Sequence, residues 1–328
     1  MERHYGRCAL CGKEGELTFE HIPPRSAFNS LRTKMYTGDQ LLADINRMPF
    51  DVQGLQYRNQ QKGSGLFSLC QSCNNLTGTW YGDSYRDMAQ IIVGAIESWK
   101  EDPVEAIGIR DVYVGRFIKQ VISMFCSVNN YESLNPYRHI NQVNQDGISP
   151  LLKTICDAQA GLSRATNMMD ELRSFVLDKD AVGLDRNRFK ICMYLTKSPF
   201  VKFNTLSSLI NLETNSYIIL SEITAFPFGF LLYFDPPDGF SPKGIDITPM
   251  EDCGYEIIAT IEFPFRFLEM NTYLPGDYRT KEEIEREIKE SGFEKAFPRQ
   301  CSLATSIIKA NIQRAISESR NDLINRIS

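Results

Sequence analysis

The residues best suited to chemistry lie near the N-terminus, in two cysteine pairs with a Glu-His pair between them. Cys8 and Cys11 form the first pair and Cys70 and Cys73 the second, each with two residues between its members. Two Cys-x-x-Cys pairs supply four thiolates, and zinc is the ion that four sulfur ligands in a tetrahedron favour. The spacing therefore predicts a structural zinc site on which the folding of this segment depends.

The Glu-His pair, Glu20 and His21, follows a short segment at 17–19 that has the composition of a β-strand. Neighbouring side chains of a strand point to opposite faces. One of the two can then hold a cation while the other accepts a proton, which is the division of labour that hydrolysis of a phosphodiester requires. The alternative is a non-catalytic pair in a zinc module that only binds nucleic acid or protein.

These motifs resemble the zinc-knuckle branch of the HNH endonucleases, the ββα-metal nuclease fold. The resemblance rests on the first Cys-x-x-Cys pair, on Glu-His-Ile-Pro-Pro at 20–24 and on Leu-Cys-x-x-Cys-Asn at 69–74. It covers about the first quarter of the chain and leaves residues 83–328 without a family.

The resemblance implies roles for individual residues. His21 would be the general base, Glu20 and Asn74 would hold a catalytic Mg²⁺ or Mn²⁺ ion, and Asn75 is the alternative amide ligand. The cysteines of the two knuckles would bind structural zinc.

The chain departs from the family pattern at three points. Glu20 stands where the family usually has Asp, and a longer side chain shifts the cation that it holds. The family's middle Asn, which orients the base, would fall near Gly65, so that Asn59 is left as the candidate for that role. The separation of the two knuckles implies an insertion at about 29–62.

Charge is distributed unevenly along the chain. The net charge of −5 argues against a protein that coats nucleic acid through bulk charge, but residues 1–82 carry nine Lys and Arg against seven Asp and Glu. Lys and Arg contact phosphate without reading sequence. The candidates for such contacts are Arg25, Arg32, Lys34, Arg58 and Lys62.

The regions beyond this segment change character along the chain. Residues 83–180 have apolar positions at helical spacing, and residues 181–328 are rich in aromatic and β-branched residues. We therefore expect an α+β protein with three parts: a zinc-stapled, HNH-like ββα-metal module at 1–82, a mainly helical region at 83–180, and a β-rich region at 181–328 that C-terminal helices close.

Individual elements follow from the same patterns. A short helix is expected to open at Asn74. Longer helices are expected at about 83–99, 111–128, 148–160, 163–177, 281–291 and 302–327. Strands are expected at 189–196, 217–224, 228–234 and 255–267.

Composition also bears on the compartment. No apolar run approaches the length of a membrane span, and the N-terminus has no apolar signal core. We therefore expect a cytoplasmic protein in which the remaining cysteines are buried free thiols and not a disulfide framework. These cysteines are Cys126, Cys156, Cys192, Cys253 and Cys301.

The sequence leads to a hypothesis and an alternative. The hypothesis is a metal-dependent endonuclease that acts on nucleic acid, DNA in preference to RNA, as a possible homodimer. Residues 83–328 would then be a sensor, a partner-binding domain or an assembly scaffold, as in bacterial restriction or antiviral defence. The alternative is a non-catalytic zinc-knuckle adaptor that binds nucleic acid or a partner protein.

Overall fold

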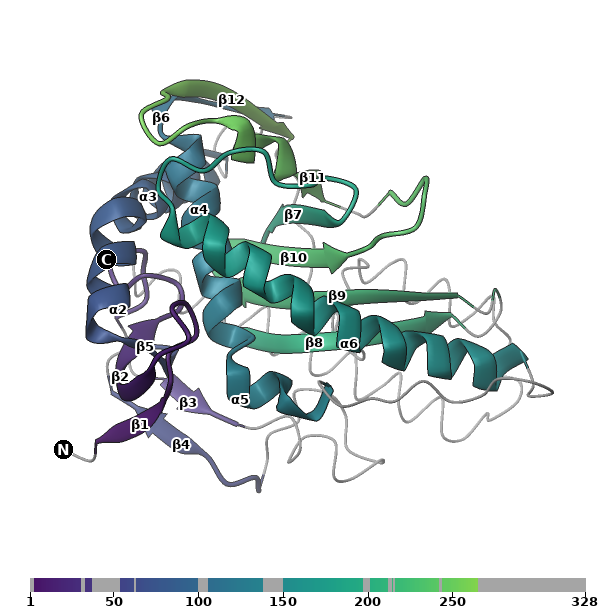
Figure 1. The fold of residues 1–328 in the computed structure, drawn as a ribbon. Coiled ribbons are helices and arrows are strands. Elements are labelled where there is room, and N and C mark those ends of the chain that lie inside the picture. Colours follow the sequence, from purple (N-terminus) through teal and green to yellow (C-terminus); the bar gives the residue numbers. More distant parts are fainter. Residues whose placement is uncertain are drawn as a thin grey trace.

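The computed structural model describes residues 3–30, 33–36, 54–61, 63–99, 106–137, 150–196, 201–211, 214, 216–241 and 244–264. These residues form a mixed α+β structure in which long helices lie against a five-stranded antiparallel sheet, with a smaller sheet beside them (Figure 1). None of the described helices has both the length and the apolar character that crossing a bilayer requires. The predicted helices at 281–291 and 302–327 lie outside the described residues.

The N-terminal sheet carries both knuckles. Its three strands are antiparallel in the order β1-β2-β5, with α2 directly after the last of them. The elements are β1 (His4–Arg7), β2 (Glu14–His21), β5 (Gly65–Cys70) and α2 (Gln71–Thr77). A separate two-stranded ribbon forms inside the predicted insertion, from β3 (Thr33–Met35) and β4 (Arg58–Gln60).

The helical region follows α2 without a break in the helical path. One turn of π-helix joins α2 to the next helix, which begins at Asp83 as the sequence predicts. The elements are η1 (Gly78–Gly82), α3 (Asp83–Trp99), α4 (Val114–Val128), α5 (Tyr131–Leu134), η2 (Asn135–Tyr137) and α6 (Pro150–Leu177).

The C-terminal part of the described chain is β-rich. Its main sheet is antiparallel in the order β11-β7-β10-β9-β8, and β12 pairs separately with β6. The elements are β6 (Ala106–Val112), β7 (Phe189–Leu195), β8 (Lys202–Asn211), β9 (Ser216–Ala225), β10 (Phe228–Phe234), β11 (Ile245–Asp246), η3 (Thr248–Asp252) and β12 (Ala259–Pro264).

Two helix predictions need correction. The helices expected at 148–160 and 163–177 are one continuous helix, α6. Gly161 does not break it, because a Cβ atom there would lie only 3.0 Å from the Tyr217 ring and 3.1 Å from Ile219, so the glycine is needed for close packing on β9. The helix expected from Asp111 begins at Val114, since Asp111 belongs to β6.

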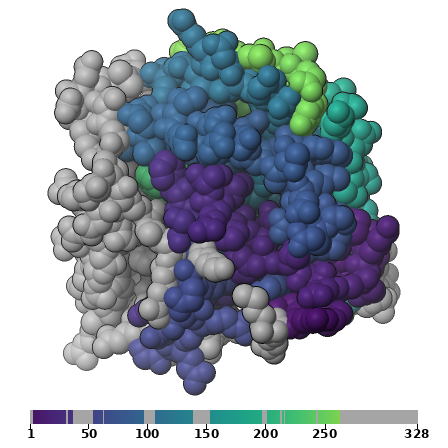
Figure 2. All heavy atoms as spheres, turned by 90° about the vertical axis from the view of Figure 1, so that its left-hand side faces the viewer, coloured from purple at the N-terminus to yellow at the C-terminus, as the bar shows by residue number. Residues whose placement is uncertain are grey.

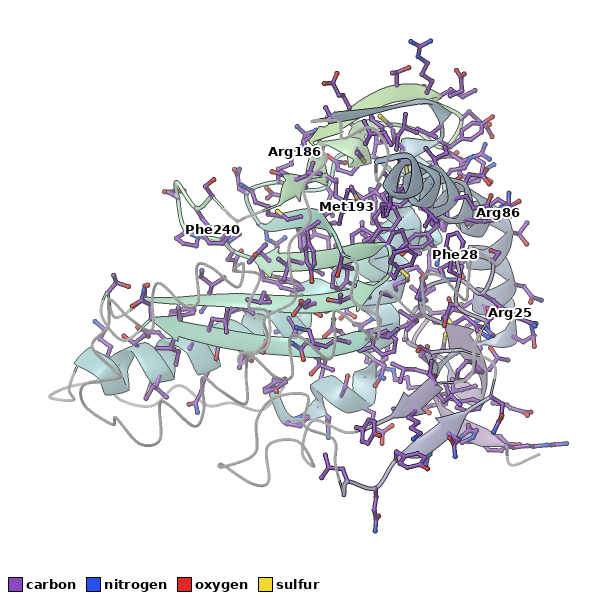
Figure 3. All side chains as sticks on the ribbon, turned by 180° about the vertical axis from the view of Figure 1, so that it is seen from behind. Arg25, Phe28, Arg86, Arg186, Met193 and Phe240 are labelled. Atoms are coloured by element: carbon purple, nitrogen blue, oxygen red, sulfur yellow. The ribbon has the colours of Figure 1, made fainter. Side chains whose placement is uncertain are left out.

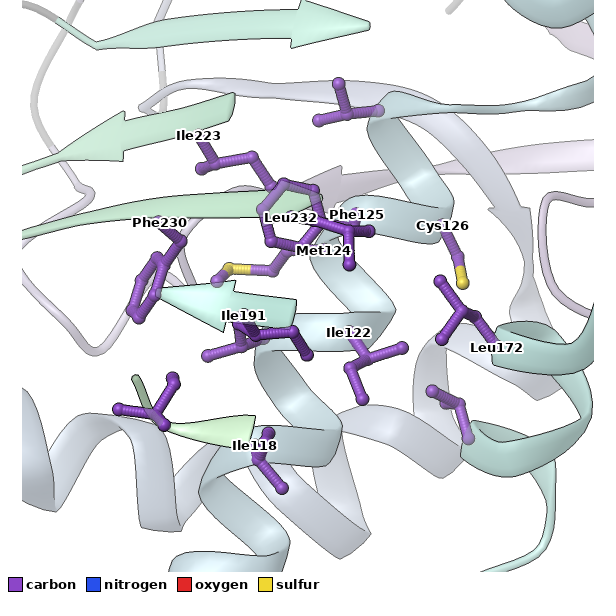
Figure 4. Packing of buried hydrophobic residues seen from close by; sticks show 14 of the residues in the cluster. Ile118, Ile122, Met124, Phe125, Cys126, Leu172, Ile191, Ile223, Phe230 and Leu232 are labelled. Atoms are coloured by element: carbon purple, nitrogen blue, oxygen red, sulfur yellow. The ribbon is translucent and has the colours of Figure 1, made fainter. Parts of the chain in front are cut away.

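The hydrophobic core is continuous from the N-terminal sheet to the main sheet. Helix α4 is buried on all sides, as expected of a helix at the centre of a core, and α6 and the main sheet pack around it (Figure 4). One cluster of buried residues extends from Cys8 in the first knuckle to Ile247 beside β11. The domain boundaries near 82 and 180 stay a prediction.

A buried arginine ties the first knuckle to the helical region. Arg173 of α6 donates from Nε to the carbonyl oxygen of Ala9 (2.8 Å) and from Nη2 to that of Asn129 (3.0 Å). Its guanidinium also lies over the Tyr131 ring, with Arg7 over the same ring at 3.9 Å. Asn129 in turn accepts from the backbone N–H of Leu206 in the main sheet (2.8 Å). Polar contacts therefore connect the knuckle, two helices and the sheet.

Replacing this arginine should destabilise the whole described fold. We expect Arg173→Met to lower the free energy of unfolding by about 2 to 4 kcal/mol, because two buried carbonyl oxygens lose their donors. The matched control is Arg164→Met on the same helix, whose side chain is 55% exposed and should change stability by less than about 0.5 kcal/mol. Urea denaturation measures both. Equal, small effects would contradict the role given to Arg173.

Candidate functional site

The four knuckle cysteines converge on one point. Their sulfur atoms all lie within 4.8 Å of one another, and those of Cys11 and Cys70 are 3.8 Å apart. Sulfurs bound at 2.3 Å to a tetrahedral zinc lie about 3.8 Å apart, whereas a disulfide would hold them at about 2.05 Å. The four thiols are free. The cluster is therefore compatible with a zinc site, as the sequence predicts.

The surroundings of Cys8 favour its thiolate form. The Cys73 thiol lowers the pKa of Cys8 to about 4 against the opposing effect of burial, and the backbone N–H of Cys70, 3.3 Å from the Cys8 sulfur, adds to the lowering. The Cys8 thiolate raises the pKa of Cys73 in turn. Zinc binds thiolates, so the lowered pKa of Cys8 favours the binding of a metal cation at this cluster.

Glu20 is a buried carboxylate that has no polar partner among the described residues. Only 6% of its surface is exposed, and no described residue gives it a hydrogen bond or an ion pair. Burial alone raises the pKa of Glu20 to about 8. An isolated buried carboxylate is costly when ionised, so a proton or a nearby cation would stabilise Glu20. Gly65 allows β5 to approach β2 closely beside Glu20, because a Cβ atom there would lie 2.0 Å from the Glu20 carbonyl oxygen.

Asn74 lies on the same face of β2 as Glu20. Its side-chain nitrogen donates to the Thr18 hydroxyl (2.9 Å) and to the Phe19 carbonyl (3.3 Å), and Thr18 and Glu20 share a face because they are two residues apart. Its amide oxygen receives no hydrogen bond from the described residues. The helix begins at Gln71, three residues earlier than predicted, so Asn74 does not open it.

Asn75 is placed differently from Asn74. Its side chain is exposed, and its amide oxygen accepts a hydrogen bond from Gln71 at 2.7 Å. Of the two amides after the second knuckle, Asn74 therefore has the oxygen that is available beside β2.

His21 is the last residue of β2, and its side chain lies on the opposite face of the strand from that of Glu20. Its ring meets the edge of Phe19 at 5.0 Å, and Phe67 continues the same aromatic row towards His4, whose ring stacks on it at 3.6 Å. Glu20 and His21 thus lie on opposite pleats of the strand, as the sequence predicts. The backbone of His21 pairs with Gly65.

A buried amide that the sequence analysis missed holds the end of β2 in place. Asn29 donates to the carbonyl oxygens of Pro23 (2.6 Å) and Ser64 (2.8 Å), and its own oxygen accepts from the Ser64 N–H (2.7 Å). It thereby joins the segment after His21 to the residue before β5. Asn59, the residue considered for orienting the base, lies exposed in β4.

The structure describes three of the five residues that are predicted to contact phosphate. Arg25, Lys34 and Arg58 are exposed, and Figure 3 shows the Arg25 side chain at the outer edge of the molecule. Arg32 and Lys62 lie outside the described residues.

Among the other cysteines, Cys126 and Cys192 are buried free thiols as expected, whereas Cys156 and Cys253 are partly exposed. Cys301 lies outside the described residues.

Comparisons with known proteins give no family for this chain. No family model, no curated protein and no solved structure matches it. The function of the site must therefore be inferred from its own residues.

Loss of one knuckle cysteine should release zinc and unfold the N-terminal sheet. We expect Cys70→Ser to lower bound zinc from one ion per chain to near zero and to lower the melting temperature, because structural zinc contributes folding free energy. Cys156→Ser, in α6 and outside the cluster, should retain the metal. Elemental analysis measures the bound zinc, and thermal melting measures the stability of each variant. A zinc-replete, stable Cys70→Ser protein would exclude the site.

Removing the Asn29 amide should loosen the end of β2. We expect Asn29→Ala to cost about 2 to 4 kcal/mol of unfolding free energy, because three buried backbone groups lose their partners. The control is Asn59→Ala, which removes an exposed amide and should cost less than about 0.5 kcal/mol. Hydrogen exchange at Ile22 and Ser64 should speed up in the first variant only.

Proposed function

We propose that residues 1–82 form the catalytic part of a metal-dependent HNH-type endonuclease that hydrolyses phosphodiester bonds in nucleic acid, with DNA as the preferred substrate. The observation that carries the proposal is Glu20, a buried carboxylate with no described polar partner, on the same face of β2 as the available oxygen of Asn74. Carboxylate and amide oxygens are the ligands that Mg²⁺ and Mn²⁺ prefer.

The donor set fits a hard divalent cation. Glu20 and Asn74 would hold it, and the cation, when bound, neutralises charge that develops on the leaving oxygen. His21 would accept the proton of the attacking water at its imidazole. The zinc-compatible cluster stabilises the strands and the helix that carry these three residues.

One observation favours the adaptor as a second candidate. The Asn74 nitrogen ties α2 to β2 through Thr18 and Phe19, which is a structural contact that a non-catalytic module would also need. In that case Glu20 would be a protonated, buried carboxyl. The two candidates differ in whether replacing Glu20 or His21 changes any chemistry.

A cleavage assay with matched variants separates the two functions. Supercoiled plasmid and a labelled RNA are incubated with Mg²⁺ or Mn²⁺ and the full chain. We expect wild-type cleavage, and a loss of about 10² to 10⁴-fold in His21→Ala, because a general base contributes a factor of that size. His4→Ala, in β1 of the same sheet, should cleave like wild type.

The Glu20→Gln variant tests whether Glu20 has a catalytic or only a structural role. It should abolish cleavage and leave the melting temperature equal or higher, since it removes a buried ionisable group without changing the shape of the side chain. Wild-type protein that folds, binds zinc and cleaves neither substrate would favour the adaptor. Cleavage by His21→Ala at the wild-type rate would remove His21 from the mechanism.

A further inference from the structure

The β3–β4 ribbon projects from the N-terminal sheet at the edge of the molecule. It lies beside β1 and β2 in Figure 1 and forms part of the lower edge of the face in Figure 2, away from the main sheet. Its antiparallel register pairs Lys34 with Asn59 and Met35 with Arg58.

The two faces of the ribbon differ. Gln60 and Met35 lie on the face that attaches it to the sheet: the Gln60 side-chain nitrogen donates to the Gly65 carbonyl oxygen (3.0 Å) and lies 4.0 Å from the Met35 sulfur. Because side chains alternate along a strand, Lys34 and Asn59 lie on the opposite face. Both are exposed.

The outward face combines a cation with aromatic rings. The Lys34 ammonium lies 4.5 Å from the centre of the Tyr57 ring, and the Tyr36 and Tyr57 rings are 5.9 Å apart. Tyr57 is 48% exposed, so part of its ring surface is open to solvent. The described ribbon residues, 33–36 and 54–61, include no Asp or Glu. The face therefore offers stacking surface and positive charge together.

The ribbon is also connected to the proposed catalytic strand. Gly65, which accepts the hydrogen bond from Gln60, pairs through its backbone with His21. A ligand that binds the outward face is thus held on a ribbon that is hydrogen-bonded to Gly65, the residue that pairs with His21 at the end of β2.

We propose that this face binds an unpaired nucleic-acid strand, with a base stacked on Tyr57 and Lys34 contacting a backbone phosphate. Every base offers an aromatic face, and exposed rings beside cations are the usual means of binding single strands. In a duplex those faces are covered by neighbouring base pairs. The inference rests on the proposed function, because it gives the endonuclease a substrate preference for unpaired segments.

The test measures binding and not cleavage. Fluorescence anisotropy follows labelled oligo-dT, oligo-U and a DNA duplex of the same length binding to the full chain without added Mg²⁺ or Mn²⁺. We expect both single strands to bind more tightly than the duplex. Tyr57→Leu should weaken single-strand binding about tenfold or more, whereas Tyr57→Phe keeps the ring and should bind like wild type.

Salt dependence tests the lysine. Lys34→Gln should reduce the slope of log K against log salt by about 0.7, the value for one phosphate contact on a single strand. Tyr217→Leu, in β9 of the main sheet, is the control for loss of a tyrosine elsewhere. Melting temperature and zinc content show that each variant is folded.

The outcomes separate this inference from the proposed nuclease. If the wild-type protein cleaves nucleic acid but Tyr57→Leu binds single strands as tightly as wild type does, the nuclease proposal stands and the role of the ribbon is overturned. A protein that prefers the duplex also overturns it. If the protein binds single strands through Tyr57 but cleaves no nucleic acid, the role of the ribbon stands and the nuclease proposal is overturned.

Discussion

The meeting of four cysteine sulfurs at one point is the constraint on which the N-terminal structure depends. Cys11 and Cys70 are 59 residues apart in sequence, yet their sulfurs are 3.8 Å apart. This contact fixes the turn between β1 and β2 against the start of α2, and so sets the register in which β2 lies between its neighbours. Glu20 is buried in this strand, with 6% of its surface exposed. A carboxylate kept in such a position is energetically unfavourable for the fold alone, and functional sites are where such costs are usually retained.

The N-terminal sheet is not a free-standing unit in this structure. Its apolar residues belong to the same cluster as α4, α6 and the main sheet, and Arg173 carries a polar connection from Ala9 to Asn129. Small zinc modules commonly lack enough core of their own. Here the metal-compatible cluster sets the local geometry, while the helices supply the buried surface. The stability of the candidate site therefore depends on residues far from it in sequence.

Most of what could be predicted from the sequence depended on short-range patterns. The cysteine spacing predicted the cluster, and aromatic and β-branched composition predicted β2, β7, β9 and β10. The misses arose where a tertiary contact decided the local structure. The helix predicted to end at residue 160 continues through Gly161, which allows α6 to pack closely on β9. Asn29 is 35 residues from Ser64, so nothing in the local pattern indicated its clamp. Strand β6 was missed because its partner, β12, lies at the far end of the described chain. The catalytic roles of Glu20, His21 and Asn74 stay predictions.

The Asn29 clamp has a consequence for how this protein can change over evolution. Because two hydrogen bonds join Asn29 to Ser64 and a third joins Asn29 to Pro23, the chain leaves the sheet and returns to it at fixed points. Lengthening a loop between fixed ends is inexpensive, about 0.6 kcal/mol for each doubling. The segment between these points is therefore free to acquire or lose residues without moving β2. Related chains would be expected to differ most in length here, while keeping the same spacing on either side of the clamp.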